Sequence, residues 1–164
     1  LLEATRIVSS RIPDFRLIIV GRGYMKDELL RYCSRVGISS NVEFAGFLAE
    51  EQKIAALRNA HVLVMPSLRE GWATPVLEAN ACGTPAVGTN VPGVRSAIID
   101  GETGYLVAYG DHVGLASRIL LLILNADRRC EMALKARALA LRYDIRNTIA
   151  KATQTLLRGL HESQ

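Results

Sequence analysis

Two glutamates, Glu70 and Glu78, stand eight residues apart on either side of an expected helix start. Thr74 fits the N-cap of that helix and Pro75 fits its first position. A helix N-terminus carries unpaired N–H groups and a partial positive charge, so it can receive an anion. Two carboxylates beside such an anion site would suit a ligand that has both hydroxyl and phosphate groups.

Small residues support this interpretation, because Gly71 and Ala73 would let an anion approach the backbone. The ordinary alternative is a plain helix start, in which Glu78 is favoured by the helix dipole and Glu70 is solvated. The spacing alone leaves both interpretations open.

A second candidate is the loop that contains Gly21 and Gly23. It lies between an expected strand and an expected helix. This context suits a phosphate-binding loop. The third glycine of a dinucleotide-binding fingerprint would fall at position 26, which holds Lys26, and no Walker A loop is present. A plain glycine turn explains the pattern equally well.

Short apolar runs that alternate with helical periodicity predict the elements that hold these loops. The expected strands are Phe15–Val20, Val42–Ala45, Val62–Met65, Pro85–Gly88 and Gly104–Val107. The expected helices are Leu1–Ile12, Asp27–Val36, Glu50–Asn59, Thr74–Cys82, Val94–Ile99, His112–Leu124, Arg128–Arg142 and Asn147–Leu160.

This alternation predicts an α/β fold with a parallel sheet that is covered on both faces. Ligands of such sheets bind beyond the carboxyl ends of the strands. The chain opens on a helix with no strand before it, and its first residue is not Met, so we expect an incomplete piece. The sheet must then close up around a gap, leave an exposed edge, or borrow a strand.

Composition favours one globular domain: 164 residues, 49% of them hydrophobic, with no run long enough to span a membrane and no signal peptide pattern. The three cysteines are scattered, which argues against disulfides and zinc and favours a cytoplasmic protein. Residues 128–158 hold eight basic and two acidic residues, net +6, against +4 for the whole chain. A solvated helix face and an anionic partner both explain this segment.

The loops and their surroundings resemble the C-terminal, nucleotide-sugar-binding half of the group 1, glycogen-synthase-like retaining glycosyltransferases with the GT-B fold. The resemblance covers nearly the whole chain, through FRLIIVGRG, NVEFAGFL, VLVMPSLREGWATPVLEANACGTPAV and DGETGYLV. The paired-glutamate motif of that family, Glu-x7-Glu, matches Glu70 and Glu78. The resemblance implies a Rossmann-like, doubly wound parallel sheet of about five strands whose first strand is missing here.

The resemblance also implies roles for single residues. Glu70 would be the catalytic residue, placed against the donor sugar ring, and Glu78 would bind the donor ribose hydroxyls. The other implied donor-binding residues are Gly71, Trp72, Ala73 and Thr74 at the diphosphate and sugar, Gly46 and Phe47 near the nucleobase, and Gly21 and Gly23 in the same cleft. No cofactor is implied, and enzymes of this fold usually need no metal.

Two departures from the family matter. Ala73 stands where a glycine is most common, so its methyl group would narrow the approach to the donor unless it is tolerated. The arginine and lysine that clamp the donor diphosphate in the family, and its acceptor-binding N-terminal half, would precede Leu1. We therefore expect one donor-binding domain over 1–164, whose C-terminal helix, 142–164, is able to cross to an N-terminal domain, and little transfer activity from these residues alone.

The implied function is retaining transfer of a hexosyl group from a UDP-, GDP- or ADP-linked sugar to a hydroxyl acceptor. A sugar-nucleotide 2-epimerase half and a non-catalytic Rossmann-like binding or assembly module are the alternatives. Nucleic acid is disfavoured as a partner, because aromatic residues make up only 5% of the chain and do not interleave with the basic ones. Peripheral membrane contact of the parent protein and self-association stay open.

Overall fold

The computed structural model describes residues 1–143, and these form an α/β structure in which parallel strands alternate with helices. The expected helix Asn147–Leu160 and most of 142–164 lie outside the described residues. The strands are β1 (Leu17–Val20), β2 (Val42–Gly46), β3 (Leu63–Met65), β4 (Ala86–Thr89) and β5 (Gly104–Val107). The helices are α1 (Leu2–Ser9), α2 (Lys26–Arg35), the 3-10 turn η1 (Ser39–Asn41), α3 (Glu50–Asn59), α4 (Thr74–Ala81), α5 (Pro92–Arg95), α6 (His112–Leu124) and α7 (Ala126–Arg142).

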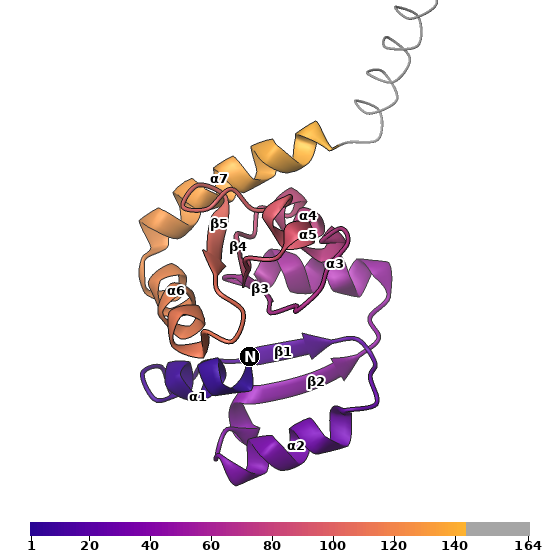
Figure 1. Ribbon diagram of the computed structural model, residues 1–164, viewed down its shortest axis with the longest axis vertical. Helices are drawn as coiled ribbons and strands as arrows, with labels where there is room; N and C mark the ends of the chain where they lie inside the picture. Colours follow the sequence, from indigo (N-terminus) through magenta and orange to yellow (C-terminus); the bar gives the residue numbers. More distant parts are fainter. Residues whose placement is uncertain (144–164) are drawn as a thin grey trace, which may run out of the picture.

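The five strands form two parallel sheets. β1 pairs with β2, and the second sheet has the order β3-β4-β5, as Figure 1 shows. The expected parallel α/β fold and its five strands are confirmed. A single continuous sheet was expected, and the hydrogen-bonded ladder is instead interrupted between β1 and β3.

Within residues 1–143, β1 and β3 each have one hydrogen-bonded neighbour, so each presents an unpaired edge. Ile18 and Val20 of β1 are 48% and 46% exposed, which is high for apolar residues of a strand. An exposed edge was one of the three arrangements that the sequence left open.

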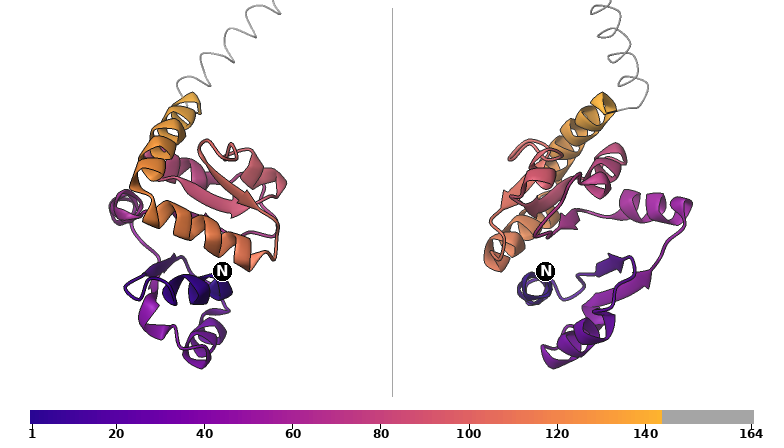
Figure 2. Two further views of the ribbon diagram at one scale, coloured as in Figure 1. Left: turned by 90° about the vertical axis from the view of Figure 1, so that its left-hand side faces the viewer. Right: turned by 45° about the vertical axis from the view of Figure 1, so that its right-hand side comes forward.

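Apolar side chains cover both faces of the three-stranded sheet because successive residues of a strand point to opposite faces. On one face, Val87 packs with residues of α1, α6 and α7, among them Ile119 and Met132. On the other face, Ala86 packs with α4 and α5, among them Val76. Figure 2 shows α6 and α4 on opposite sides of this sheet. A third cluster joins β1 and β2 to α2 and α1.

Side-chain caps set several helix starts. Asp111 accepts a hydrogen bond from Gly114 N at 2.7 Å at the start of α6, and Asn125 accepts one from Arg128 N at 2.9 Å at the start of α7. The Gln52 side chain accepts from Ala49 N at 3.0 Å and fixes the first turn of α3.

The basic segment has structural roles in the part that the structure describes. Arg128 donates hydrogen bonds to the Tyr105 hydroxyl and to the Gly101 carbonyl. Arg129 donates to the carbonyls of Leu122 and Ile123, the last carbonyls of α6. These two arginines therefore tie α7 to its neighbours rather than marking a solvated face alone. No helix among residues 1–143 is both long and apolar enough to cross a membrane.

Candidate functional site

The loop 66–73 carries Glu70 from β3 to α4 and is fixed at two points. The Thr89 hydroxyl at the end of β4 donates a hydrogen bond to the Ser67 carbonyl. Gly93 of α5 lies against the Glu70–Gly71 peptide so closely that a Cβ at position 93 would fall 2.2 Å from Glu70 O. The backbone that carries Glu70 is therefore held by β4 and α5.

The N-terminus of α4 lies one residue earlier than expected. Ala73, and not Thr74, is the N-cap, and Pro75 is the second helical residue. The Thr74 hydroxyl donates to Trp72 O at 3.4 Å instead of capping the helix. This helix start has no side-chain cap, but its first N–H groups have backbone partners: Thr74 N donates to Trp72 O at 2.6 Å and Val76 N donates to Ala73 O at 2.9 Å.

Ala73 directs its methyl group into the protein core. It is 1% exposed and belongs to the apolar cluster that includes Val76 and Val94. The sequence left open whether this methyl group narrows a ligand's approach or is tolerated, and its burial favours the second outcome. Gly71, Trp72 and Thr74 are exposed around it, which leaves the outer side of this helix start open.

The two glutamates differ in their surroundings. Glu78 forms an ion pair with Lys53 of α3, and Lys53 Nζ donates a hydrogen bond to Glu78 Oε1 at 2.7 Å. Glu70 is half-buried, and among residues 1–143 its carboxylate forms no ion pair and accepts no side-chain hydrogen bond. Glu78 is thus oriented by the protein, whereas the Glu70 carboxylate is available to a ligand.

Lys53 contacts the candidate site through Glu78, and sequence reasoning missed it. Its Nζ also lies 2.9 Å from Glu50 Oε2, and these hydrogen bonds, to Glu78 first and Glu50 second, raise its pKa above the ordinary value. A lysine in the first turn of a helix opposes the helix dipole, which is an unfavourable position that could have drawn attention to it.

The second group of predicted residues lies at the carboxyl ends of β1 and β2. Gly21 N donates to Gly46 O at 2.7 Å, and both glycines have positive φ, 120° and 68°. The Arg22 guanidinium lies 5.9 Å from the centre of the Phe47 ring, which is itself 71% exposed. The structure thus brings Gly21, Gly46 and Phe47 together, with Gly23 in the next turn.

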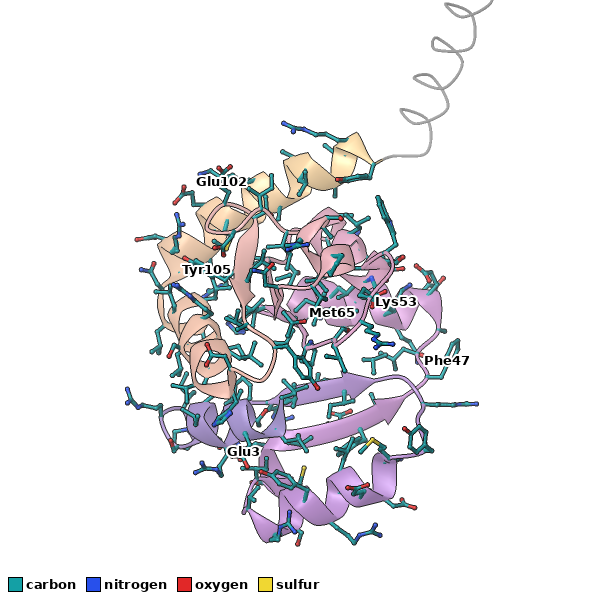
Figure 3. All side chains as sticks on the ribbon, in the orientation of Figure 1. Glu3, Phe47, Lys53, Met65, Glu102 and Tyr105 are labelled. Atoms are coloured by element: carbon teal, nitrogen blue, oxygen red, sulfur yellow. The ribbon has the colours of Figure 1, made fainter. Side chains whose placement is uncertain are left out.

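Helix α3 connects the two groups. It begins four residues after Gly46, and Lys53 in its first turn reaches Glu78 of α4. Figure 3 shows Phe47 and Lys53 on the same side of the molecule. The segment from β2 into α3 therefore links the two groups: it follows the glycine pair at the end of β2, and it contacts one of the paired glutamates through Lys53.

Trp72 contacts the end of α7. Its ring meets Tyr143 edge to face at a centroid distance of 5.8 Å, and the Tyr143 hydroxyl donates to Ser96 O at 3.2 Å. Trp72 is 54% exposed, so the contact with Tyr143 leaves much of the residue open. The sequence did not indicate this contact, because the two residues lie 71 positions apart.

A cavity of about 300 Å³ opens at the carboxyl ends of β3, β4 and β5. Its lining includes Pro66, Thr89, Val107 and Tyr109, together with the N-terminus of α6. None of the ten predicted site residues lines it. The cavity and the paired glutamates therefore lie apart from each other, although both are near the carboxyl ends of the strands.

Comparison with known proteins places this arrangement. The family model described as Glycosyl transferases group 1 matches residues 1–139. The chain belongs to the group 1 glycosyltransferases. The D-inositol 3-phosphate glycosyltransferase of Corynebacterium urealyticum is 32% identical over 98% of the chain, and the chain spans 39% of that relative.

Solved structures show which part of the GT-B fold this group 1 chain matches. The C-terminal domain of the group 1 glycosyltransferase LpcC from Francisella tularensis superposes with a TM-score of 0.76 at 26% identity, covering 85% of this chain and 74% of that one. Anabaena HepE, solved in complex with UDP-glucose, gives a TM-score of 0.78 at 25% identity over 87% of this chain and 41% of that one. The chain matches the C-terminal domain of GT-B glycosyltransferases.

Proposed function

We propose that this chain is the nucleotide-sugar-binding module of a retaining hexosyltransferase. The observation that carries the proposal is the pair Glu70 and Glu78, held by a fixed loop and by α4 on either side of an uncapped helix start. Membership of the group 1 family and the UDP-glucose complex of HepE support a donor of the UDP-sugar class.

Each part of this arrangement has a task in sugar transfer. Glu78 accepts hydrogen bonds from the two ribose hydroxyls of the donor. The backbone at Gly71 and Trp72 and the positive end of the α4 dipole meet the diphosphate, where negative charge accumulates as the bond to the sugar breaks. The Glu70 carboxylate lies against the sugar ring and stabilises the positive charge that develops at the anomeric carbon.

The outcome is transfer to a hydroxyl acceptor with retained anomeric configuration. The anomeric carbon–oxygen bond breaks with its electron pair moving to the diphosphate. The acceptor oxygen forms the new bond on the same face, and its proton passes to the departing diphosphate. The chain spans 39% of its relative's length, and we propose that turnover needs an N-terminal domain that supplies the acceptor site. We also propose that the chain self-associates through the edges of β1 and β3, which are unpaired among residues 1–143.

A thermal-shift panel tests donor binding. We expect UDP-glucose, GDP-glucose or ADP-glucose at a hundred times its Kd to raise the free energy of unfolding by about 2.7 kcal/mol. Glucose without a nucleotide serves as the control and should leave the melting temperature unchanged. If none of the three nucleotide sugars stabilises the chain, the non-catalytic assembly module replaces the donor-binding module.

Trp72 offers an independent readout, because it is the only tryptophan of the chain and lies in the loop next to Glu70. Because Trp72 is 54% exposed, a ligand that covers the start of α4 would change its surroundings. We expect the nucleotide sugar that stabilises the chain to change the tryptophan emission in a saturable titration. Emission that stays constant at saturating ligand would place the binding site away from this loop.

A further inference from the structure

We propose that Lys53 is a positioning residue for Glu78, and that it sets how tightly the ribose of the donor is held. The inference rests on the proposed function, because it assigns a partner to the carboxylate that receives the ribose. Lys53 is not part of the paired-glutamate motif and lies 25 residues before Glu78 in the chain.

Lys53 forms an ion pair with two glutamates. Lys53 Nζ lies 2.7 Å from Glu78 Oε1 and 2.9 Å from Glu50 Oε2, so one ammonium bridges two carboxylates on two helices. The side chains of Lys53 and Glu78 are 28% and 33% exposed, whereas that of Glu50 is 70% exposed. The Lys53–Glu78 contact is thus the sheltered half of the bridge.

The contact with Lys53 occupies one of the two carboxylate oxygens of Glu78. Lys53 engages Oε1 of Glu78, and the structure gives Oε2 no side-chain partner among residues 1–143. A carboxylate has acceptor positions on both oxygens, so Oε2 can accept hydrogen bonds from a pair of neighbouring hydroxyls. Without Lys53, the Glu78 side chain would have to be ordered by the ligand itself, which costs side-chain entropy on binding.

The ion pair serves to orient the Glu78 side chain rather than to stabilise the fold. Partly exposed ion pairs contribute little to the stability of the fold. Because hydrogen bonds to both carboxylates raise the pKa of Lys53, the ammonium stays charged throughout the neutral range.

Direct contact between Lys53 and the diphosphate is the competing role. An ammonium has three donors, and two of them face Glu78 and Glu50. The two roles differ in their dependence on the ribose. A positioning residue for Glu78 matters only for ligands that have ribose hydroxyls, whereas a phosphate-binding lysine matters for every diphosphate.

The test measures Kd by calorimetry for UDP, GDP and ADP, each beside its 2′,3′-dideoxy analogue, with the natural protein that carries this sequence. For the nucleotide that binds, we expect Lys53→Met to weaken binding about tenfold, the scale of one charge-assisted hydrogen bond. The dideoxy analogue should bind the wild type and Lys53→Met equally. Lys53→Arg should restore most of the ribose-dependent affinity.

Glu50→Gln is the matched control, because it removes the exposed half of the bridge and leaves the Lys53–Glu78 contact in place. Its Kd values should equal those of the wild type. Equal weakening of both nucleotide forms by Lys53→Met would assign Lys53 to the phosphate or to the fold and overturn the proposal. Unchanged binding by Lys53→Met, with a ribose-dependent loss in Glu78→Gln, overturns the role of Lys53 alone. A wild type that binds none of the nucleotides overturns donor binding itself.

Discussion

Replacing Glu70 with glutamine in the natural protein that carries this sequence should lower kcat at least about a hundredfold, the usual cost of one group that stabilises transition-state charge. Glutamine keeps the volume of the side chain and removes the charge. The Glu70 carboxylate has no ion-pair partner among residues 1–143, so its loss should leave the free energy of unfolding nearly unchanged. Steady-state kinetics with the donor found in the thermal-shift panel measures the effect.

Glu102→Gln is the control for this prediction. Glu102 is an exposed glutamate in the turn before β5, far from Lys53 in Figure 3. Its substitution should leave kcat and KM at wild-type values. A Glu70→Gln enzyme that retains more than about a third of the wild-type kcat would remove Glu70 from the reacting centre. An effect on KM alone would instead assign Glu70 to donor binding.

The sequence predicted the elements of this fold well because their signals are local. Each strand is a short apolar run that ends at a glycine, a proline or a polar turn, and the structure confirms all five within two residues at either end. The helix expected at Glu50–Asn59 and the strand expected at Gly104–Val107 are confirmed at both ends. The parallel pairing also followed, since helices separate the strands along the chain.

The division into two sheets could not be predicted in the same way. The apolar run of β1 indicates a strand, but hydrogen bonding to a neighbour depends on what else occupies the sheet. The sequence therefore left three arrangements open, and only the structure shows that β1 and β3 each keep an unpaired edge. Ile18 and Val20 point to the same face of β1, opposite Leu17 and Ile19, and this face is the exposed one.

The supports of the candidate site were beyond sequence reasoning for a related reason. Glu70 and Glu78 were found because they belong to one contiguous motif. The partners that hold this motif in place, Lys53 and Gly93, lie 25 residues before Glu78 and 23 residues after Glu70, on other elements. The effect of Ala73 stayed open because the direction of its methyl group depends on where α4 begins, which the sequence placed one residue late.

Gly93→Ala should therefore impair the site while both glutamate side chains stay unchanged in the sequence. The added Cβ would lie 2.2 Å from Glu70 O and 2.9 Å from Gly71 C, both backbone atoms that cannot rotate away. We expect a loss of about 1–3 kcal/mol in the free energy of unfolding from the overpacking. The loop that carries Glu70 must also shift, and a displacement of about 1 Å at a reacting group costs about a hundredfold in rate.

Gly104→Ala separates these two effects. A Cβ at Gly104 would lie 2.2 Å from Ala86 O, the same clash distance, but inside the sheet and not against the loop 66–73. Both variants should lose stability in chemical denaturation, measured with the natural protein. Turnover per folded molecule, assayed well below the melting temperature, should fall about a hundredfold in Gly93→Ala and stay near the wild-type value in Gly104→Ala. Equal turnover per folded molecule in the two variants would mean that the contact between α5 and the Glu70–Gly71 peptide serves folding only, and that Glu70 keeps its place without it.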